Sequence, residues 1–143
     1  MKRNVLAVSL FAALLLFFNS AGASVVKVMT IDGAIGPITL KHIERAIKIA
    51  EDENAAALVV KLNTPGGVME TTLRIGTAFM NSKVPIIVWV TPSGGRAASA
   101  GVYITYAAHV AAMSSSTNIG SATPVTMGGE KMDSAMVKKV TND

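Results

Sequence analysis

The chain has 143 residues, of which 50% are hydrophobic and 15% are charged, and this composition fits one folded domain without long disorder. The net charge of +4 falls to +2 without Lys2 and Arg3, because 11 basic then face 9 acidic residues, and nothing points to a nucleic-acid partner. Cysteine is absent, which excludes disulfides, thiolate metal sites and a cysteine nucleophile.

The N-terminus has the pattern of a secretory signal. Lys2 and Arg3 precede an apolar run over 5–18, which is followed by Ala21-Gly22-Ala23. The run is short for a membrane span, which needs about 20 residues. We expect residues 1–23 to be a signal peptide cleaved after Ala23, or else an N-terminal anchor. Residues 24–143 are then exported, and periplasmic, extracytoplasmic or membrane-associated.

The first half of the domain predicts two strand–helix units. A strand over 25–31 is followed by a helix that opens at Pro37, where proline loses no hydrogen bond. A second strand over 58–62 is apolar apart from Lys61, which suits a sheet covered on both faces. The helix that follows starts near Met69. The predicted buried stripes are Leu40, Ile43, Ile47 and Ala50 in the first helix, and Met69, Leu73, Gly76 and Met80 in the second.

The second half continues the alternation. We expect a strand over 86–90, a helix over 97–108 and a short strand over 110–113. A Ser/Thr/Gly/Pro-rich loop is expected over 114–129, followed by a tail with helical spacing from Glu130. Alternating strands and helices predict an α/β fold with a mainly parallel sheet, whose carboxyl edge collects ligands.

Two glycine-rich loops leave strands at that edge. The loop over 94–101 places Ser99 among alanines and glycines at a strand-to-helix turn, which is how a chain presents a hydroxyl nucleophile. The other loop, Pro65-Gly66-Gly67, offers the N–H of Gly67, which with the N–H of Ala100 would form a two-donor oxyanion hole. The alternative interpretation is a Gly/Ser turn with a helix cap and an ordinary Pro-Gly turn.

A serine nucleophile needs a proton acceptor, and neither histidine suits the role. His42 is expected on the surface, and His109 lies ten residues after Ser99, about 15 Å along a helix. Two distant histidines also give no metal site. A desolvated lysine can replace histidine as the base. Lys131 is expected in water, and Lys138 and Lys139 point about 100° apart on one helix, so physical reasoning leaves these two open.

Four motifs occur in the order seen in one protein family. They are Asn63-Thr64-Pro65-Gly66-Gly67, Gly94-Gly95-Arg96-Ala97-Ala98-Ser99-Ala100-Gly101, Ile119-Gly120-Ser121-Ala122 and Lys139-Val140-Thr141-Asn142. With them the chain resembles the membrane-associated serine proteases of the NfeD (nodulation efficiency) group, which share the ClpP/crotonase-like α/β fold. The resemblance implies that Ser99 is the nucleophile, that Lys139 rather than Lys138 is the base, and that Gly67 and Ala100 form the oxyanion hole.

The resemblance also implies the substrate class. It points to a Ser-Lys endopeptidase that needs no cofactor and cleaves hydrophobic segments of a stomatin-like membrane protein, at the membrane and as a possible homo-oligomer. Family domains continue beyond the lysine motif, so we expect residues 24–143 to be incomplete at the C-terminus, with uncertain activity. The alternatives are a non-catalytic ClpP-like module that binds partners and a crotonase-type acyl-CoA enzyme, which an export signal disfavours because CoA is cytoplasmic.

Overall fold

The computed structural model describes residues 24–123 and residue 133. Residues 1–23, where a signal peptide or anchor was expected, and the tail that carries Lys138 and Lys139 lie outside the described residues. Along the described chain the elements are β1 (Val26–Asp32), α2 (Pro37–Asp52), β2 (Ala57–Asn63), α3 (Met69–Met80), β3 (Ile86–Val90), β4 (Arg96–Ala98), α4 (Ala100–Tyr106), β5 (Val110–Met113) and β6 (Asn118–Gly120).

The predicted parallel α/β sheet is confirmed. Its four strands run in the order β1-β2-β3-β5, and every neighbouring pair is parallel. The register aligns Val28 with Val59, Val59 with Ile87, and Ile87 with Val110, so these four side chains share one face. The carboxyl ends of β2 and β3 therefore lie at the same edge, from which both glycine-rich loops depart.

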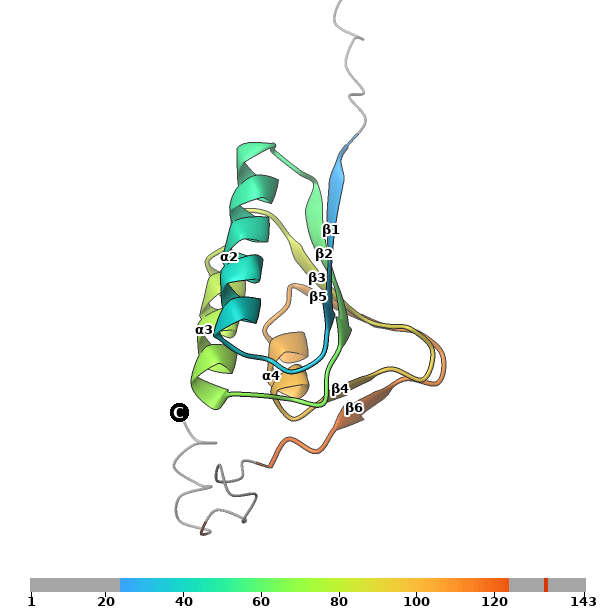
Figure 1. The fold of residues 1–143 in the computed structure, drawn as a ribbon. Helices are drawn as coiled ribbons and strands as arrows, with labels where there is room; N and C mark the ends of the chain where they lie inside the picture. The colour runs from blue at the N-terminus through green and yellow to red at the C-terminus, as the bar shows by residue number, and fades with distance from the viewer. Residues whose placement is uncertain (1–23, 124–132, 134–143) are drawn as a thin grey trace, which may run out of the picture.

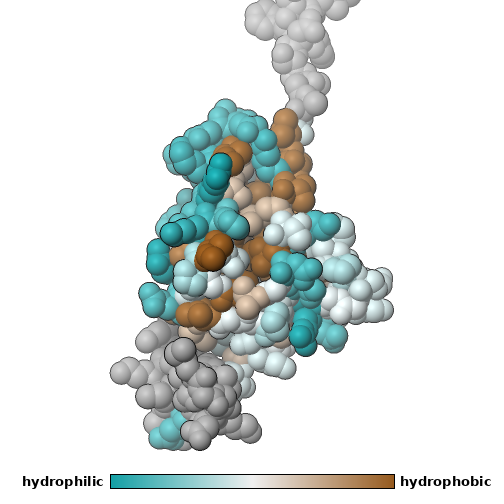
Figure 2. Space-filling model, viewed as in Figure 1, coloured by the Kyte–Doolittle hydropathy of each residue, from teal (hydrophilic) through white to brown (hydrophobic). Residues whose placement is uncertain are grey.

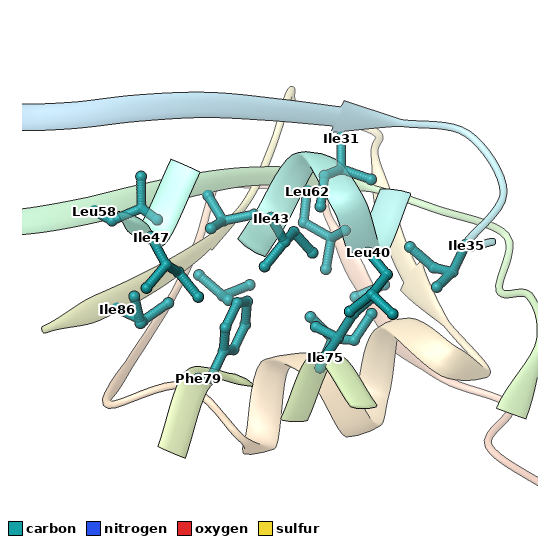
Figure 3. Packing of buried hydrophobic residues seen from close by; sticks show 14 of the residues in the cluster. Ile31, Ile35, Leu40, Ile43, Ile47, Leu58, Leu62, Ile75, Phe79 and Ile86 are labelled. Atoms are coloured by element: carbon teal, nitrogen blue, oxygen red, sulfur yellow. The ribbon is translucent and has the colours of Figure 1, made fainter. Parts of the chain in front are cut away.

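The three helices α2, α3 and α4 lie on one side of this sheet and enclose the hydrophobic core (Figure 1). The predicted stripe of α2 is buried as expected. On α3 the prediction was wrong: Leu73 and Met80 are 59% and 68% exposed, and of the predicted stripe only Gly76 is buried. The core side chains that pack between sheet and helices in Figure 3 include Ile31, Leu40, Ile43, Ile47, Leu58, Leu62, Ile75, Phe79 and Ile86.

The second face of the sheet differs from the prediction. Within the described residues no helix covers it, and Val28 and Val110 are 62% and 51% exposed. Figure 2 shows the hydrophobic side chains along the β1 edge as a brown band. The apolar run of β2 indicated burial on both faces, but Val59 and Lys61 are only half-buried. No helix of the described part is long and apolar enough to cross a bilayer.

Two short strands were not predicted. The helix was expected to begin at Ala97, but Arg96–Ala98 forms β4, and the helix begins at Ala100. The loop expected over 114–129 contains β6, which pairs in parallel with β4 and forms a small second sheet beside the main one (Figure 1). The remainder of that loop, from residue 124, lies outside the described residues.

Candidate active site

Ser99 stands between β4 and α4 in an unusual backbone conformation. Its φ is 50° and its ψ is −112°, a region that residues with a side chain rarely adopt. Hydrogen bonds fix the residue on both sides, since its N–H donates to the carbonyl of Gly120 at 3.0 Å and its carbonyl accepts from Val102 at 3.0 Å. Strain of this kind persists only where the surroundings enforce it, and it is typical of a nucleophile held on a sharp turn.

The Pro-Gly-Gly loop lies directly against Ser99. A Cβ added to Gly66 would stand 2.7 Å from the Cβ of Ser99 and 3.2 Å from its Oγ, so only glycine fits there. Gly66 also has a φ of +120°, which glycine alone adopts without strain. The bare backbone of this loop thus faces the hydroxyl at a distance that any side chain would increase.

Gly67 is held in place by Ile35, in the connection between β1 and α2. Ile35 donates to the carbonyl of Gly66 at 2.9 Å and accepts from the N–H of Val68 at 3.0 Å. These two hydrogen bonds are made by the residues on either side of Gly67, so the N–H of Gly67 itself takes no part in the pairing with Ile35. A Cβ on Gly67 would meet the Ile35 carbonyl oxygen at 2.0 Å, so close packing again requires glycine.

The end of β2 fastens β4 to the rest of the sheet. Thr64 donates its N–H to the carbonyl of Arg96 at 2.7 Å and accepts from Ala98 at 3.1 Å. The Asn63 carboxamide accepts the N–H of Arg96 at 3.0 Å and donates to Asp32 at 2.9 Å. Asn63 and Thr64 therefore set the position of the strand that carries Ser99.

The predicted site residues have the following places. Ser99 is half-buried, Ala100 begins α4, and Gly67 lies on the loop packed against Ser99. Because Ala100 is the first residue of the helix, its N–H has no acceptor within the helix. Lys138 and Lys139 fall outside the described residues, so their position relative to Ser99 stays a prediction.

The two histidines have the following places. His42 is exposed on α2. His109 follows α4, and its Nδ1 accepts a hydrogen bond from the N–H of Ile86 at 3.0 Å. In the described part of the chain no three His, Cys, Asp or Glu side chains gather into a possible metal site.

Sequence reasoning missed two residues that position the serine turn, Asn63 through its side chain and Gly120 through its backbone carbonyl. Asn63 and Gly120 contact β4 and Ser99 across 33 and 21 positions of sequence, and only the pairing of strands reveals those contacts. Their presence in the Asn-Thr-Pro-Gly-Gly and Ile-Gly-Ser-Ala motifs was the one available signal.

The fold is an α/β fold of the ClpP-like class. It combines a parallel sheet that has helices on one face, a small second sheet, and a strained serine turn against a Gly-Gly loop. A ClpP1 variant from Listeria monocytogenes has this fold, with a TM-score of 0.64 at 20% identity over 81% of this chain and 64% of that one. Residues 25–142 match the family described as NfeD1b, N-terminal domain, and the chain belongs to that family.

Solved structures of one family relative are similar. A serine-to-alanine mutant of the 1510-N membrane-bound stomatin-specific protease superposes with a TM-score of 0.77 at 33% identity, over 84% of this chain and 60% of that chain. A lysine-to-alanine mutant of that protease, in complex with a substrate peptide, gives 0.76 at 36% identity over 79% and 54%.

Two full-length relatives are much longer than this chain. The membrane-bound protease PH1510 of Pyrococcus horikoshii is 40% identical over 102 residues, which are 71% of this chain and 23% of that protein. The membrane protein NfeD1b of Bacillus subtilis is 29% identical over 91 residues, which are 64% of this chain and 20% of that protein. The chain thus spans about a quarter or less of the length of either relative.

Proposed function

We propose that this chain is the peptidase domain of a serine endopeptidase with Ser99 as nucleophile and Lys139 as general base. The observation that carries the proposal is the strained Ser99 turn packed against the bare backbone of Gly66. The relatives add support, because structures exist of the stomatin-specific protease with a serine or a lysine replaced by alanine, the latter with a substrate peptide bound.

The proposed reaction has two stages. The neutral amine of Lys139 takes the hydroxyl proton as Ser99 Oγ attacks the peptide carbonyl carbon, and the new oxyanion accepts hydrogen bonds from Gly67 and Ala100. The lysine ammonium then protonates the leaving amine, and the acyl-enzyme remains. Water, deprotonated by the same lysine, hydrolyses this ester and regenerates Ser99.

The proposed substrate is a hydrophobic segment of a stomatin-like membrane protein, and one relative is named a membrane-bound stomatin-specific protease. Access to such a segment requires the domain to stand at the membrane. We therefore propose export and membrane association, with residues 1–23 as signal peptide or anchor, and a homo-oligomer as the working form.

A serine-directed covalent probe tests the proposal. Wild-type protein should be labelled and Ser99→Ala should not. Lys139→Ala should slow labelling at least about 100-fold, because a general base contributes 10²–10⁴-fold. Lys139→Arg should fail equally, since arginine stays protonated. Lys138→Ala is the matched control, and slow labelling of this variant with normal labelling of Lys139→Ala would contradict the dyad.

A second measurement separates catalysis from binding. Peptides from a stomatin-like protein should be cleaved by the wild type and bound without cleavage by Ser99→Ala. If the wild type binds them without cleavage and is not labelled, the alternative of a partner-binding module is correct.

A further inference from the structure

A shallow hollow of about 310 Å³ opens on the small second sheet, immediately beside Ser99. The described residues that line it come from β4, β6 and the residue after β6: Arg96, Ala98, Asn118, Ile119, Gly120 and Ser121. Ala98 directly precedes Ser99, and Gly120 accepts the hydrogen bond of the Ser99 N–H. A group seated in the hollow would therefore lie next to the candidate nucleophile.

The register of the two strands explains the hollow. Ala98 is aligned with Gly120, so this pair presents one methyl group and no second side chain. A Cβ added to Gly120 would meet nothing within 4 Å, which means that the position faces open space. Arg96 is aligned with Asn118 two residues earlier in each strand. Because alternate residues of a strand share a face, these two polar side chains lie on the same face as Ala98 and Gly120.

Among the described residues that line it, the hollow carries positive charge. Arg96 is the only charged residue among them, and it is exposed. Among the described residues the Arg96 guanidinium has no ion pair, and neither it nor the Asn118 carboxamide has a hydrogen-bond partner. An arginine fork matches a carboxylate in two parallel bonds, and an amide nitrogen can add a third donor.

We propose that this hollow binds a carboxylate of the peptide substrate and that Arg96 is a specificity-determining residue for it. The inference rests on the proposed peptidase function, since a peptide laid across Ser99 supplies the ligand. Glutamate or aspartate side chains and a free C-terminus share the carboxylate group, so either is a possible source. Arg96 would select among substrates by binding the carboxylate beside the scissile bond, and it would take no part in the chemistry at Ser99.

Peptide binding to the full chain carrying Ser99→Ala tests the inference without cleavage. Apolar peptides with an amidated C-terminus carry Glu or Gln at each position in turn, and fluorescence anisotropy gives the Kd. At low salt one position should favour Glu about fivefold, the gain of a solvent-accessible ion pair. The preference should shrink as salt is raised. A Gln peptide with a free C-terminus tests the other source of the carboxylate.

Variants of the hollow separate its charge from the net charge of the protein. Adding Arg96→Gln should abolish the preference for the carboxylate. Arg96→Glu should replace it with a preference for Lys over Gln at the same position. Arg45→Gln is the matched control, because Arg45 is an exposed arginine on α2, away from the second sheet, and this change should leave the preference intact.

Failure of this inference differs from failure of the peptidase proposal. A preference for the carboxylate that persists in Arg96→Gln, no preference at any position, or no binding of any peptide would overturn the role of Arg96. Labelling of Ser99 by the covalent probe is read separately on the wild-type protein. An Arg96-dependent preference in a protein that is never labelled would support the hollow and contradict the peptidase.

Discussion

Single residues at the serine turn hold conformations that most side chains do not tolerate. Ser99 adopts its positive φ at a cost of about 1–3 kcal/mol, which the rest of the fold must offset. The backbone hydrogen bonds of Ser99 with Gly120 and Val102 hold the residue in that conformation. Local strain at Ser99 and the bare backbone of Gly66 therefore occur together at one hydroxyl.

Gly66→Ala tests this close approach. The added methyl would have to displace Ser99, and the positive φ adds strain, so we expect a loss of about 2–4 kcal/mol in unfolding free energy and no labelling of Ser99. Gly33→Ala is the matched control: its φ is +129°, but a Cβ there would meet nothing within 4 Å. It should cost about 1–2 kcal/mol and leave labelling normal. Equal effects of the two variants on labelling would contradict the steric explanation.

Asn63 has a positioning role that a second substitution can measure. Asn63→Ala removes its bonds to Asp32 and to the Arg96 N–H, and should cost about 1–3 kcal/mol in urea denaturation, since each bond contributes about 0.5–1.5 kcal/mol. It should also slow labelling of Ser99, because β4 loses one of its ties. Asn81→Ala, at an exposed position after α3, should change neither quantity. Normal labelling in Asn63→Ala would show that Thr64 alone suffices.

At the scale of elements, α4 reaches the end of β2 because Gly101 has no side chain. A Cβ there would stand 2.7 Å from Cγ2 of Thr64 and 3.1 Å from Cβ of Ala97. Both of those residues are fully buried and belong to the framework of the serine turn. The spacing of Ser99 from the glycine loop is therefore set partly by helix packing two residues further on.

Two helical glycines allow this packing to be tested. Gly101→Ala should destabilise the fold by about 1–3 kcal/mol, because the methyl overpacks a rigid contact. Gly76→Ala, in α3, would bring a Cβ only to 3.4 Å from Ala107, an ordinary contact. That variant should gain up to about 1 kcal/mol from helix propensity. Thermal unfolding measures both, and a stabilised Gly101→Ala variant would contradict the tight contact.

The elements that could be predicted correctly are those whose own residues carry a clear hydrophobic pattern. The stripe of α2 repeats at helical spacing, and β3 is an uninterrupted apolar run, so both were predicted correctly. On α3 the buried side chains include Thr71 and Thr72, and the hydroxyl of Thr72 is satisfied by the carbonyl of Val68 at 2.9 Å. Hydropathy alone could not favour these threonines over Leu73.

The serine turn was predictable only in part for a related reason. Glycines around Ser99 indicated a close approach, but Arg96–Ala98 has no strand alternation, and alanine favours helix in isolation. The residues become β4 because Thr64 and β6 pair with them across the sequence. Tertiary pairing of this kind leaves no local signal.

At the scale of the whole molecule, the described sheet has one face packed by helices and one face without them. Adjacent residues of β3 point to opposite faces of the sheet. Ile86 is fully buried, whereas Ile87 lies half-buried on the other face. Both positions carry isoleucine, and they are adjacent in the same strand. Their difference in stability therefore reports how unequally the two faces are packed.

Ile86→Ala and Ile87→Ala make that comparison directly. Ile86→Ala removes side-chain atoms from the core and leaves a cavity, so it should cost about 2–5 kcal/mol. Ile87→Ala removes less buried area and leaves no closed cavity, so it should cost about 1 kcal/mol. Urea denaturation with equal m-values for the two variants would make the comparison valid. Equal losses at both positions would show that the second face is packed as tightly as the first, and would contradict a core that lies on one side of the sheet.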